Sequence, residues 1–220
     1  MALSAAQAAT FAAFTGLVIA GASAHAETRR VNNITNISSI EAEGRFRIEI
    51  VSGATAGATL TGAPDDVARV GIRYRDGDIR FWEKCTVFCG NQELDVVVRI
   101  VAPQLTSLEL SKGVEATATG LSAQTLSVDL AMGASLRATG QCDTLEADVA
   151  MGGALSAENL ACRRVVVDAA MGGSADVRAS AEAEADASMG GAITIYGNPP
   201  RIDSSGSMGG TISTPDQVAG

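Results

Sequence analysis

Met132-Gly133-Ala134-Ser135 is the first of five copies of one short motif; the others are Met151-Gly152-Gly153-Ala154, Met171-Gly172-Gly173-Ser174, Met189-Gly190-Gly191-Ala192 and Met208-Gly209-Gly210-Thr211. Successive methionines are 19, 20, 18 and 19 residues apart, and a degenerate copy, Lys112-Gly113-Val114, stands 20 residues before Met132. A fixed period near 19 residues is typical of stacked units that are each too small to bury an apolar face alone. The motif therefore predicts a repeat architecture for the second half of the chain.

The residues before each methionine alternate in character. Positions two, four and six before it are apolar, as in Leu126, Val128 and Leu130, and the positions between them are mostly polar. This alternation predicts a strand with one buried face. The glycine pair then allows a corner with positive φ, and a second short strand and a bend complete the unit. We therefore predict an all-β fold, a right-handed parallel β-solenoid (β-helix), and we call each turn of it, about 19 residues long, a rung.

The part of the chain before the repeats predicts hairpins. Asp76-Gly77 lies between alternating segments at 71–74 and 78–82, which is a strong hairpin signal. Further strands are predicted at 45–50, 58–61 and 93–101. We expect one domain at 27–214, with a hairpin-rich N-terminal part at 27–103, repeat rungs at 104–214 and a tail at 215–220.

The first 26 residues predict a signal peptide. They contain no Asp, Glu, Lys or Arg, are apolar from residue 11 to 21, and end in Ala24-His25-Ala26. An apolar region before an A-x-A site is typical of a cleaved leader, although the usual positive n-region is missing. A transmembrane anchor is the alternative, but the apolar run is short and alanine-rich for a span. We expect export to the periplasm, the outer-membrane surface or the extracellular space, with no membrane span after cleavage.

The charge is concentrated in the repeats. Residues 27–112 carry 11 basic and 12 acidic residues, a net charge of −1, whereas residues 113–220 carry 5 and 13, a net charge of −8. An acidic repeat region argues against nucleic acid and anionic lipid as partners. The charge does not exclude cations or basic proteins as partners. The aromatic content of 4% fits narrow rungs.

The four cysteines are consistent with an oxidising compartment. Cys85 and Cys89 could close a small loop. Cys142 and Cys162 each stand nine residues before a methionine, so they are predicted to lie on adjacent rungs, about 4.8 Å apart. That separation suits a disulfide, with two unlinked core thiols as the alternative.

Four segments resemble a known family. In order, they are Gly44-Arg45-Phe46-Arg47-Ile48-Glu49-Ile50, Tyr74-Arg75-Asp76-Gly77-Asp78-Ile79, Val98-Arg99-Ile100-Val101-Ala102-Pro103-Gln104-Leu105 and Tyr196-Gly197-Asn198-Pro199. With the repeated corners, they make the chain similar to the GIN-domain family of auto-transporter adhesin head domains over about residues 34–213. The resemblance implies a secreted or envelope β-solenoid and no settled biochemical activity. Met-Gly-Gly mostly replaces the usual corner tripeptide, so no role of its serine is carried over.

A row of acidic residues is the strongest candidate site. Each stands three residues before a corner: Glu109, Asp129, Asp148, Asp168 and Asp186. In register, we expect them to form a row along one outer face, which we call the acidic ladder. Stacked carboxylates repel each other unless cations, raised pKa values or solvation offset the cost. Ca²⁺ is the candidate cation, although no dedicated calcium-binding loop is present. A solvated face that limits aggregation is the simpler interpretation.

Two further groups have alternative interpretations. The five motif methionines suggest thioether ligands for copper, but sulfur filling a corner of the core is the interpretation we favour. The segment with Phe81, Trp82 and Phe88 is a candidate contact loop, and capping of the open end of the core is its alternative.

Nothing in the sequence predicts catalysis. The one histidine, His25, lies in the leader, and no nucleophile elbow or phosphate loop is present. We predict an exported, non-enzymatic protein that binds or scaffolds at the cell envelope, with a surface glycan or an envelope protein as partner. The alternative is a polysaccharide-active β-helix enzyme, but the basic residues that such chemistry needs are scattered in the repeats.

Overall fold

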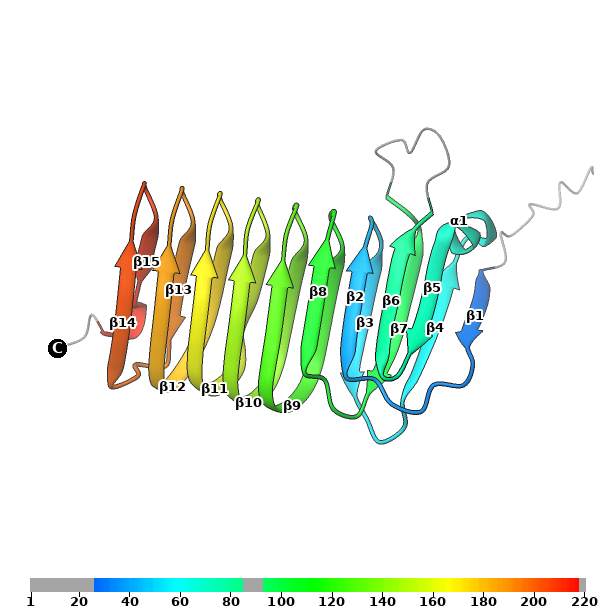
Figure 1. The fold of residues 1–220 in the computed structure, drawn as a ribbon, viewed down its shortest axis with the longest axis horizontal. Coiled ribbons are helices and arrows are strands. Elements are labelled where there is room, and N and C mark those ends of the chain that lie inside the picture. Colours follow the sequence, from blue (N-terminus) through cyan, green and yellow to red (C-terminus); the bar gives the residue numbers. More distant parts are fainter. Residues whose placement is uncertain (1–25, 85–92, 218–220) are drawn as a thin grey trace, which may run out of the picture.

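A computed structural model describes residues 26–84 and 93–217. They form a right-handed β-solenoid of about five turns, in which the chain rises on one side, crosses at the motif and returns on the other (Figure 1). Fifteen strands of these residues hydrogen-bond into one continuous sheet. Long strands bend from one side to the other, so the sheet has two facing layers. The predicted fold class is confirmed.

The regular rungs begin after residue 106. Their strands are β8 (Ser107–Ser111), β9 (Glu115–Leu130), β10 (Ser135–Val149), β11 (Ala154–Ala169), β12 (Ser174–Ala187), β13 (Ala192–Tyr196), β14 (Arg201–Gly206) and β15 (Thr211–Ser213). A 3₁₀ turn at Pro215–Gln217 follows, and its Asp216 carboxylate accepts a hydrogen bond from the Gly197 N–H at 2.8 Å. Neighbouring rungs pair in parallel, with residues 19 or 20 positions apart side by side in β9, β10 and β11.

The N-terminal part adds shorter elements. They are β1 (Glu27–Val31), β2 (Ser39–Glu43), β3 (Arg47–Ser52), β4 (Gly57–Gly62), α1 (Pro64–Arg69), β5 (Val70–Arg75), β6 (Asp78–Glu83) and β7 (Val96–Ala102). The predicted hairpin about Asp76-Gly77 is β5–β6, and both turn residues have positive φ. The pairs β1–β4 and β4–β7 are also antiparallel.

The rungs of the N-terminal part are not stacked in chain order. Strand β2 pairs in parallel with both β6 and β8, and β3 pairs in parallel with both β7 and β9. The rung β2–β3 therefore lies between β6–β7 and β8–β9, and both layers of the solenoid continue through it. The front layer of Figure 1 has the order β5-β6-β2-β8-β9-β10-β11-β12-β14, and the back layer β1-β4-β7-β3-β9-β10-β11-β12-β13-β15.

Apolar side chains fill the space between the two layers. In the second half of β9 the inward residues are Leu126, Val128 and Leu130, and all are buried. The equivalent residues of β12 are three alanines, also buried, so the core becomes narrower toward the C-terminus. In β14 the alternation ends and most residues are exposed. This loss of apolar residues marks the last rung.

The corner at each motif is a two-residue turn. In the third copy Met171 and Gly172 have φ of 50° and 75°, and the N–H of Gly173 donates to the carbonyl of Ala170 at 2.9 Å. Positive φ at both central residues is the signature of a type I′ turn. The left-handed pair is therefore the methionine and the first glycine, and the second glycine, where we also expected positive φ, does not have it.

The prediction that the methionines fill the core is wrong. Four of them are 46–49% exposed and Met208 is 79% exposed. The alternation of inward and outward residues ends before the methionine, where the turn begins. The alternation from which we expected an inward methionine sulfur therefore does not extend to the methionine.

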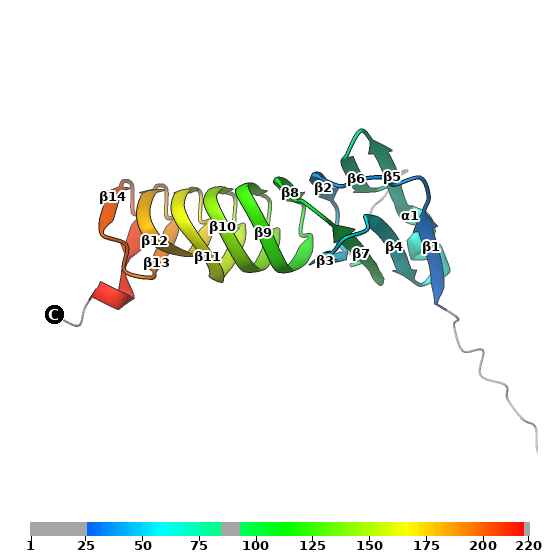
Figure 2. The same ribbon diagram turned by 90° about the horizontal axis from the view of Figure 1, so that it is seen from below.

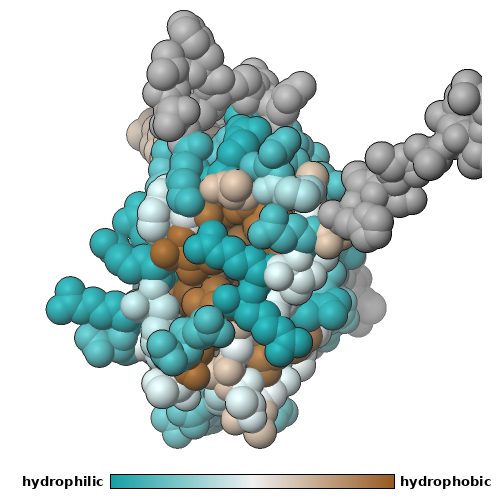
Figure 3. All heavy atoms as spheres, turned by 90° about the vertical axis from the view of Figure 1, so that its right-hand side faces the viewer, coloured by the Kyte–Doolittle hydropathy of each residue, from teal (hydrophilic) through white to brown (hydrophobic). Residues whose placement is uncertain are grey.

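The two ends of the solenoid differ. Figure 2 shows α1 and β1 at the end opposite to β14. Seen end-on from the N-terminal side, apolar side chains lie in the middle of the surface, with hydrophilic side chains around and across them (Figure 3). No helix among residues 26–84 and 93–217 is long and apolar enough to cross a membrane.

Candidate functional site

The structure places the acidic ladder in one row. Residues of neighbouring strands are paired in the order Glu41, Glu109, Asp129, Asp148, Asp168, Asp186. Sequence reasoning missed Glu41, because its rung lies outside the repeats and is inserted from earlier in the chain. The row ends at β6, where Arg80 pairs with Glu41 and with Glu43, each at 3.2 Å.

Burial and mutual repulsion act on the ladder carboxylates. Partial burial and then the charge of Asp148 raise the pKa of Asp129. The same causes, with Asp186 and Glu184 added, raise the pKa of Asp168. Partial burial, Glu41 and Asp129 raise the pKa of Glu109, against the opposing charge of Arg80. The negative charge of this row is therefore an unfavourable term for the folded state.

This charge predicts how stability depends on pH. A carboxyl group whose pKa is higher in the folded than in the unfolded state destabilises the fold once both are ionised, so stability is gained as the pH falls through the folded pKa. We expect Asp168→Asn to raise the free energy of unfolding at pH 7 by about 1 kcal/mol, since it removes repulsion from two neighbours in a solvated row. The gain over wild type is expected to be smaller at pH 4, because the folded protein then takes up a proton at this carboxyl more readily than the unfolded chain does.

Urea unfolding at pH 7 and pH 4 measures this difference. The control is Glu43→Gln, because a hydrogen bond from Lys112 lowers the pKa of Glu43. That variant is expected to be less stable than wild type at pH 7. A ladder variant that is no more stable than wild type at pH 7 would show that solvent screens the row completely.

The ladder does not by itself form a metal site. Among the described residues, no group of three or more His, Cys, Asp or Glu side chains is arranged to hold a metal ion. The ladder carboxylates point outward from a flat layer and are exposed to solvent. The calcium hypothesis therefore gains no support from the geometry.

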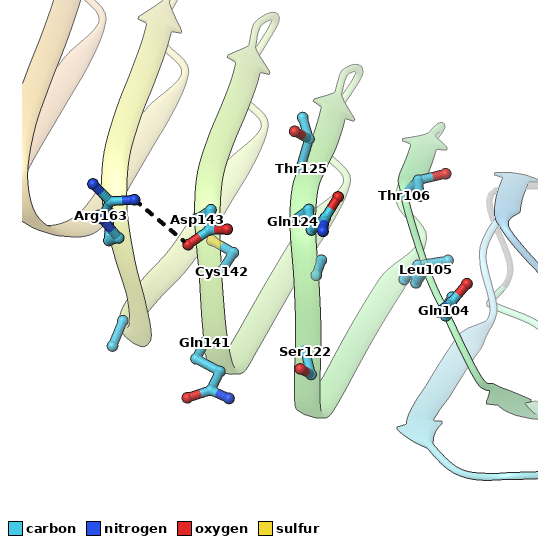
Figure 4. Close-up of a pocket in the computed structure, with 12 residues that line it drawn as sticks. Gln104, Leu105, Thr106, Ser122, Gln124, Thr125, Gln141, Cys142, Asp143 and Arg163 are labelled. Atoms are coloured by element: carbon cyan, nitrogen blue, oxygen red, sulfur yellow. Dashed lines mark ion pairs between the residues drawn. The ribbon is translucent and has the colours of Figure 1, made fainter.

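A groove on the bend side of the solenoid is a second candidate site (Figure 4). It has a volume of about 910 Å³ and crosses the segment before β8 and then β9, β10 and β11. The bends between the two layers occur at equivalent positions in these rungs, so their polar side chains lie next to one another. The residues that present polar groups to the groove are Gln104, Thr106, Ser122, Gln124, Thr125, Gln141, Asp143 and Arg163. We call this surface the bend groove.

The floor of the bend groove is fixed. Leu105 and Cys142 are buried below it, and Cys142 is bonded to Cys162 on the next rung with a Cα–Cα distance of 4.5 Å. The disulfide predicted from the repeat spacing is confirmed. Asp143 and Arg163 form an ion pair at 4.0 Å across the same two rungs. The bend groove thus lies over cross-linked rungs.

Neutral hydrogen-bonding groups are available in the bend groove. Gln124 and Gln141 are exposed, and in the described part of the chain neither side chain has a hydrogen-bond partner. The Thr106 hydroxyl is already used, since it donates to the carbonyl of Ser38 at 3.0 Å. Three of the six glutamines of the sequence, at 104, 124 and 141, line the groove. These glutamines are spaced by about the length of one rung. That spacing could have indicated the groove from the sequence, but the sequence analysis did not use it.

The predicted aromatic contact loop is not assembled as expected. Phe81 is fully buried in the core, so its assignment as a contact residue is wrong, because it faces inward in the alternation of β6. Trp82 is half-buried and packs over Gly71, where a Cβ would lie 2.2 Å from the indole Cε2. Phe88, Cys85 and Cys89 lie outside the described residues.

Comparisons with known proteins agree with this fold. The profile of a family described as "Putative auto-transporter adhesin, head GIN domain" matches residues 36–199. No curated protein sequence matches the chain. A crystal structure of a "putative adhesin" from Bacteroides fragilis superposes with a TM-score of 0.70 at 15% identity, over 86% of this chain and 96% of that one.

Two proteins of Parabacteroides distasonis are also similar in structure. A "putative lipid binding protein" has a TM-score of 0.53 at 17% identity, and a "putative adhesin" has 0.50 at 13% identity. Both comparisons cover 87% of this chain and 97% of the other. At these identities the likeness shows a shared fold.

Proposed function

The chain belongs to the family described as "Putative auto-transporter adhesin, head GIN domain". On this basis we propose that it is an exported, adhesin-like protein that binds a cell-surface glycan through the bend groove. The observation that carries the proposal is the set of exposed amides and hydroxyls above a fixed floor. Amide groups donate and accept hydrogen bonds at once, as sugar hydroxyl groups do. A few well-placed polar groups in a concave surface are typical of specific small-ligand sites.

Export is supported by two features of the chain. The disulfide between Cys142 and Cys162 is of a kind that persists in oxidising compartments. The first 26 residues have the composition of a cleaved leader. Both fit a protein that acts in the periplasm, on the outer-membrane surface or outside the cell.

The chemistry of the bend groove favours binding over catalysis. Glycoside hydrolysis generally uses two carboxyl groups flanking the scissile bond. Asp143 is the carboxylate among the residues that line the groove, and it is paired with Arg163. We therefore favour a binding role for these rungs over the polysaccharide-active enzyme.

Binding of residues 27–220 to a panel of cell-surface polysaccharides, with and without calcium, tests the proposal. We expect Gln124→Ala with Gln141→Ala to weaken binding 10-fold or more, since each lost hydrogen bond costs about 1 kcal/mol. The control is Thr117→Ala with Ser156→Ala, two polar residues on the outer face of the back layer. If the wild type, the glutamine variant and the control variant bind equally well, the binding site is not the bend groove. If the protein binds only to protein components of the envelope, the partner is an envelope protein and not a glycan.

A further inference from the structure

The exposed methionines form a row at turn positions where methionine is not a favoured residue. They are Met132, Met151, Met171, Met189 and Met208, which we call the methionine row. The first central position of a type I′ turn favours Asn, Asp or Gly. A methionine there gives up the glycine advantage at positive φ, and in four of the five copies about half of its surface stays exposed. Lys112 holds the equivalent position one rung earlier, also with positive φ, and its ammonium pairs with Glu43 outside the core.

The turns that carry the row are stacked directly on one another. The N–H of Gly133 donates to the carbonyl of Met151 at 3.2 Å, and the N–H of Gly172 donates to that of Met189 at the same distance. Strands of a sheet are about 4.8 Å apart, so neighbouring methionines start from backbones about that far apart. Each side chain is unbranched and has three rotatable bonds. Thioethers of adjacent rungs can therefore reach one ion between them.

We propose that the methionine row binds a soft monovalent cation, of the class of Cu⁺ and Ag⁺. Thioether sulfur is a neutral, soft ligand that selects Cu⁺ over the hard ions Ca²⁺ and Mg²⁺, which prefer oxygen. Methionine coordinates without losing a proton, so coordination by its sulfur does not itself depend on pH. The proposal rests on these five side chains and does not depend on the bend groove.

The acidic ladder assists the methionine row without supplying ligands. In β9 to β12 an aspartate of the ladder stands three residues before each methionine, on the outer face of the front layer. A row of negative charges beside neutral ligands raises the local concentration of cations. This contribution is screened by salt, whereas coordination by sulfur is not.

Silver(I) is the probe for the test, because it needs no reductant and leaves the disulfide intact. Residues 27–220 are titrated with silver nitrate in a chloride-free buffer at pH 5 and pH 7, by calorimetry. The variant is Met151→Leu with Met171→Leu and Met189→Leu, since leucine keeps the volume and apolar character of methionine but has no sulfur. All cysteines are kept, so silver bound by sulfur elsewhere is common to both proteins.

We expect the wild type to bind silver at both pH values and the triple variant to bind at least 10-fold more weakly or with fewer ions. Asp148→Asn with Asp168→Asn is the charge control, and its effect is expected to disappear in 0.5 M sodium nitrate while that of the triple variant persists. Circular dichroism and the unfolding temperature verify that each variant is folded. A wild type that binds no silver, or a triple variant that binds it equally well, would overturn the proposal.

Discussion

Removing the disulfide between Cys142 and Cys162 is expected to lower the free energy of unfolding by about 3 kcal/mol. The two cysteines are 20 residues apart in sequence, and their bond joins adjacent rungs of the parallel pair β10–β11. A cross-link that closes such a loop lowers the conformational entropy of the unfolded chain. In the chain-entropy account this is the larger part of its stabilising effect. Urea unfolding of Cys142→Ala with Cys162→Ala measures the loss.

The single variant Cys142→Ala with Cys162 kept is the matched control, since it also lacks the bond but retains one thiol. Both variants are expected to unfold at nearly the same urea concentration, well below that of wild type. Reduction of the wild type by dithiothreitol is expected to have a similar effect. A double variant as stable as wild type would mean that the backbone hydrogen bonds between the rungs hold the bend without the cross-link.

The second glycine of the third motif is expected to accept a side chain only at a large cost in stability. A Cβ at Gly173 would lie 2.2 Å from the carbonyl oxygen of Val149 and 2.7 Å from its carbon. Both are backbone atoms of the preceding rung, so they can move aside only by shifting the stacked rungs. We expect Gly173→Ala to cost about 3 kcal/mol, near the upper end of the range for overpacking. Thermal and urea unfolding measure it.

The neighbouring glycine provides the control. A Cβ at Gly172 meets nothing within 4 Å, but φ there is +75°. Gly172→Ala therefore loses only the left-handed preference of glycine, about 1 kcal/mol. Gly153→Ala is expected to be milder than Gly173→Ala, since its nearest atom is the Leu130 oxygen at 2.8 Å. Equal losses at Gly172 and Gly173 would contradict the close approach of the rungs.

Most of the fold could be predicted from the repeat period. It predicted which residues are inward, as in Leu126 and Val128, and it predicted that Cys142 and Cys162 are adjacent. These predictions depend only on the pairing register of the rungs, because parallel rungs of equal length place equivalent residues side by side. The order of the acidic ladder follows from the same property.

Other features depend on tertiary structure that no local pattern encodes. The insertion of β2–β3 between β6–β7 and β8 brought Glu41 beside Glu109, although 68 residues separate them in sequence. Alternation does not extend into a turn, which is why the exposure of Met171 was missed. The bend groove arises from side chains on successive bends, each of which looks like an ordinary polar loop in the sequence.

Photo-crosslinking on intact cells tests the central claim, that this solenoid binds the cell surface through the bend groove. A benzophenone amino acid is placed at Gln124 in the groove, or at Thr117, which is exposed on the back layer. Residues 27–220 carrying each probe are irradiated with cells, and the covalent products are compared. The account predicts products containing envelope polysaccharide from position 124 and few from position 117. Equal yields from the two positions, or products from position 117 alone, would contradict it.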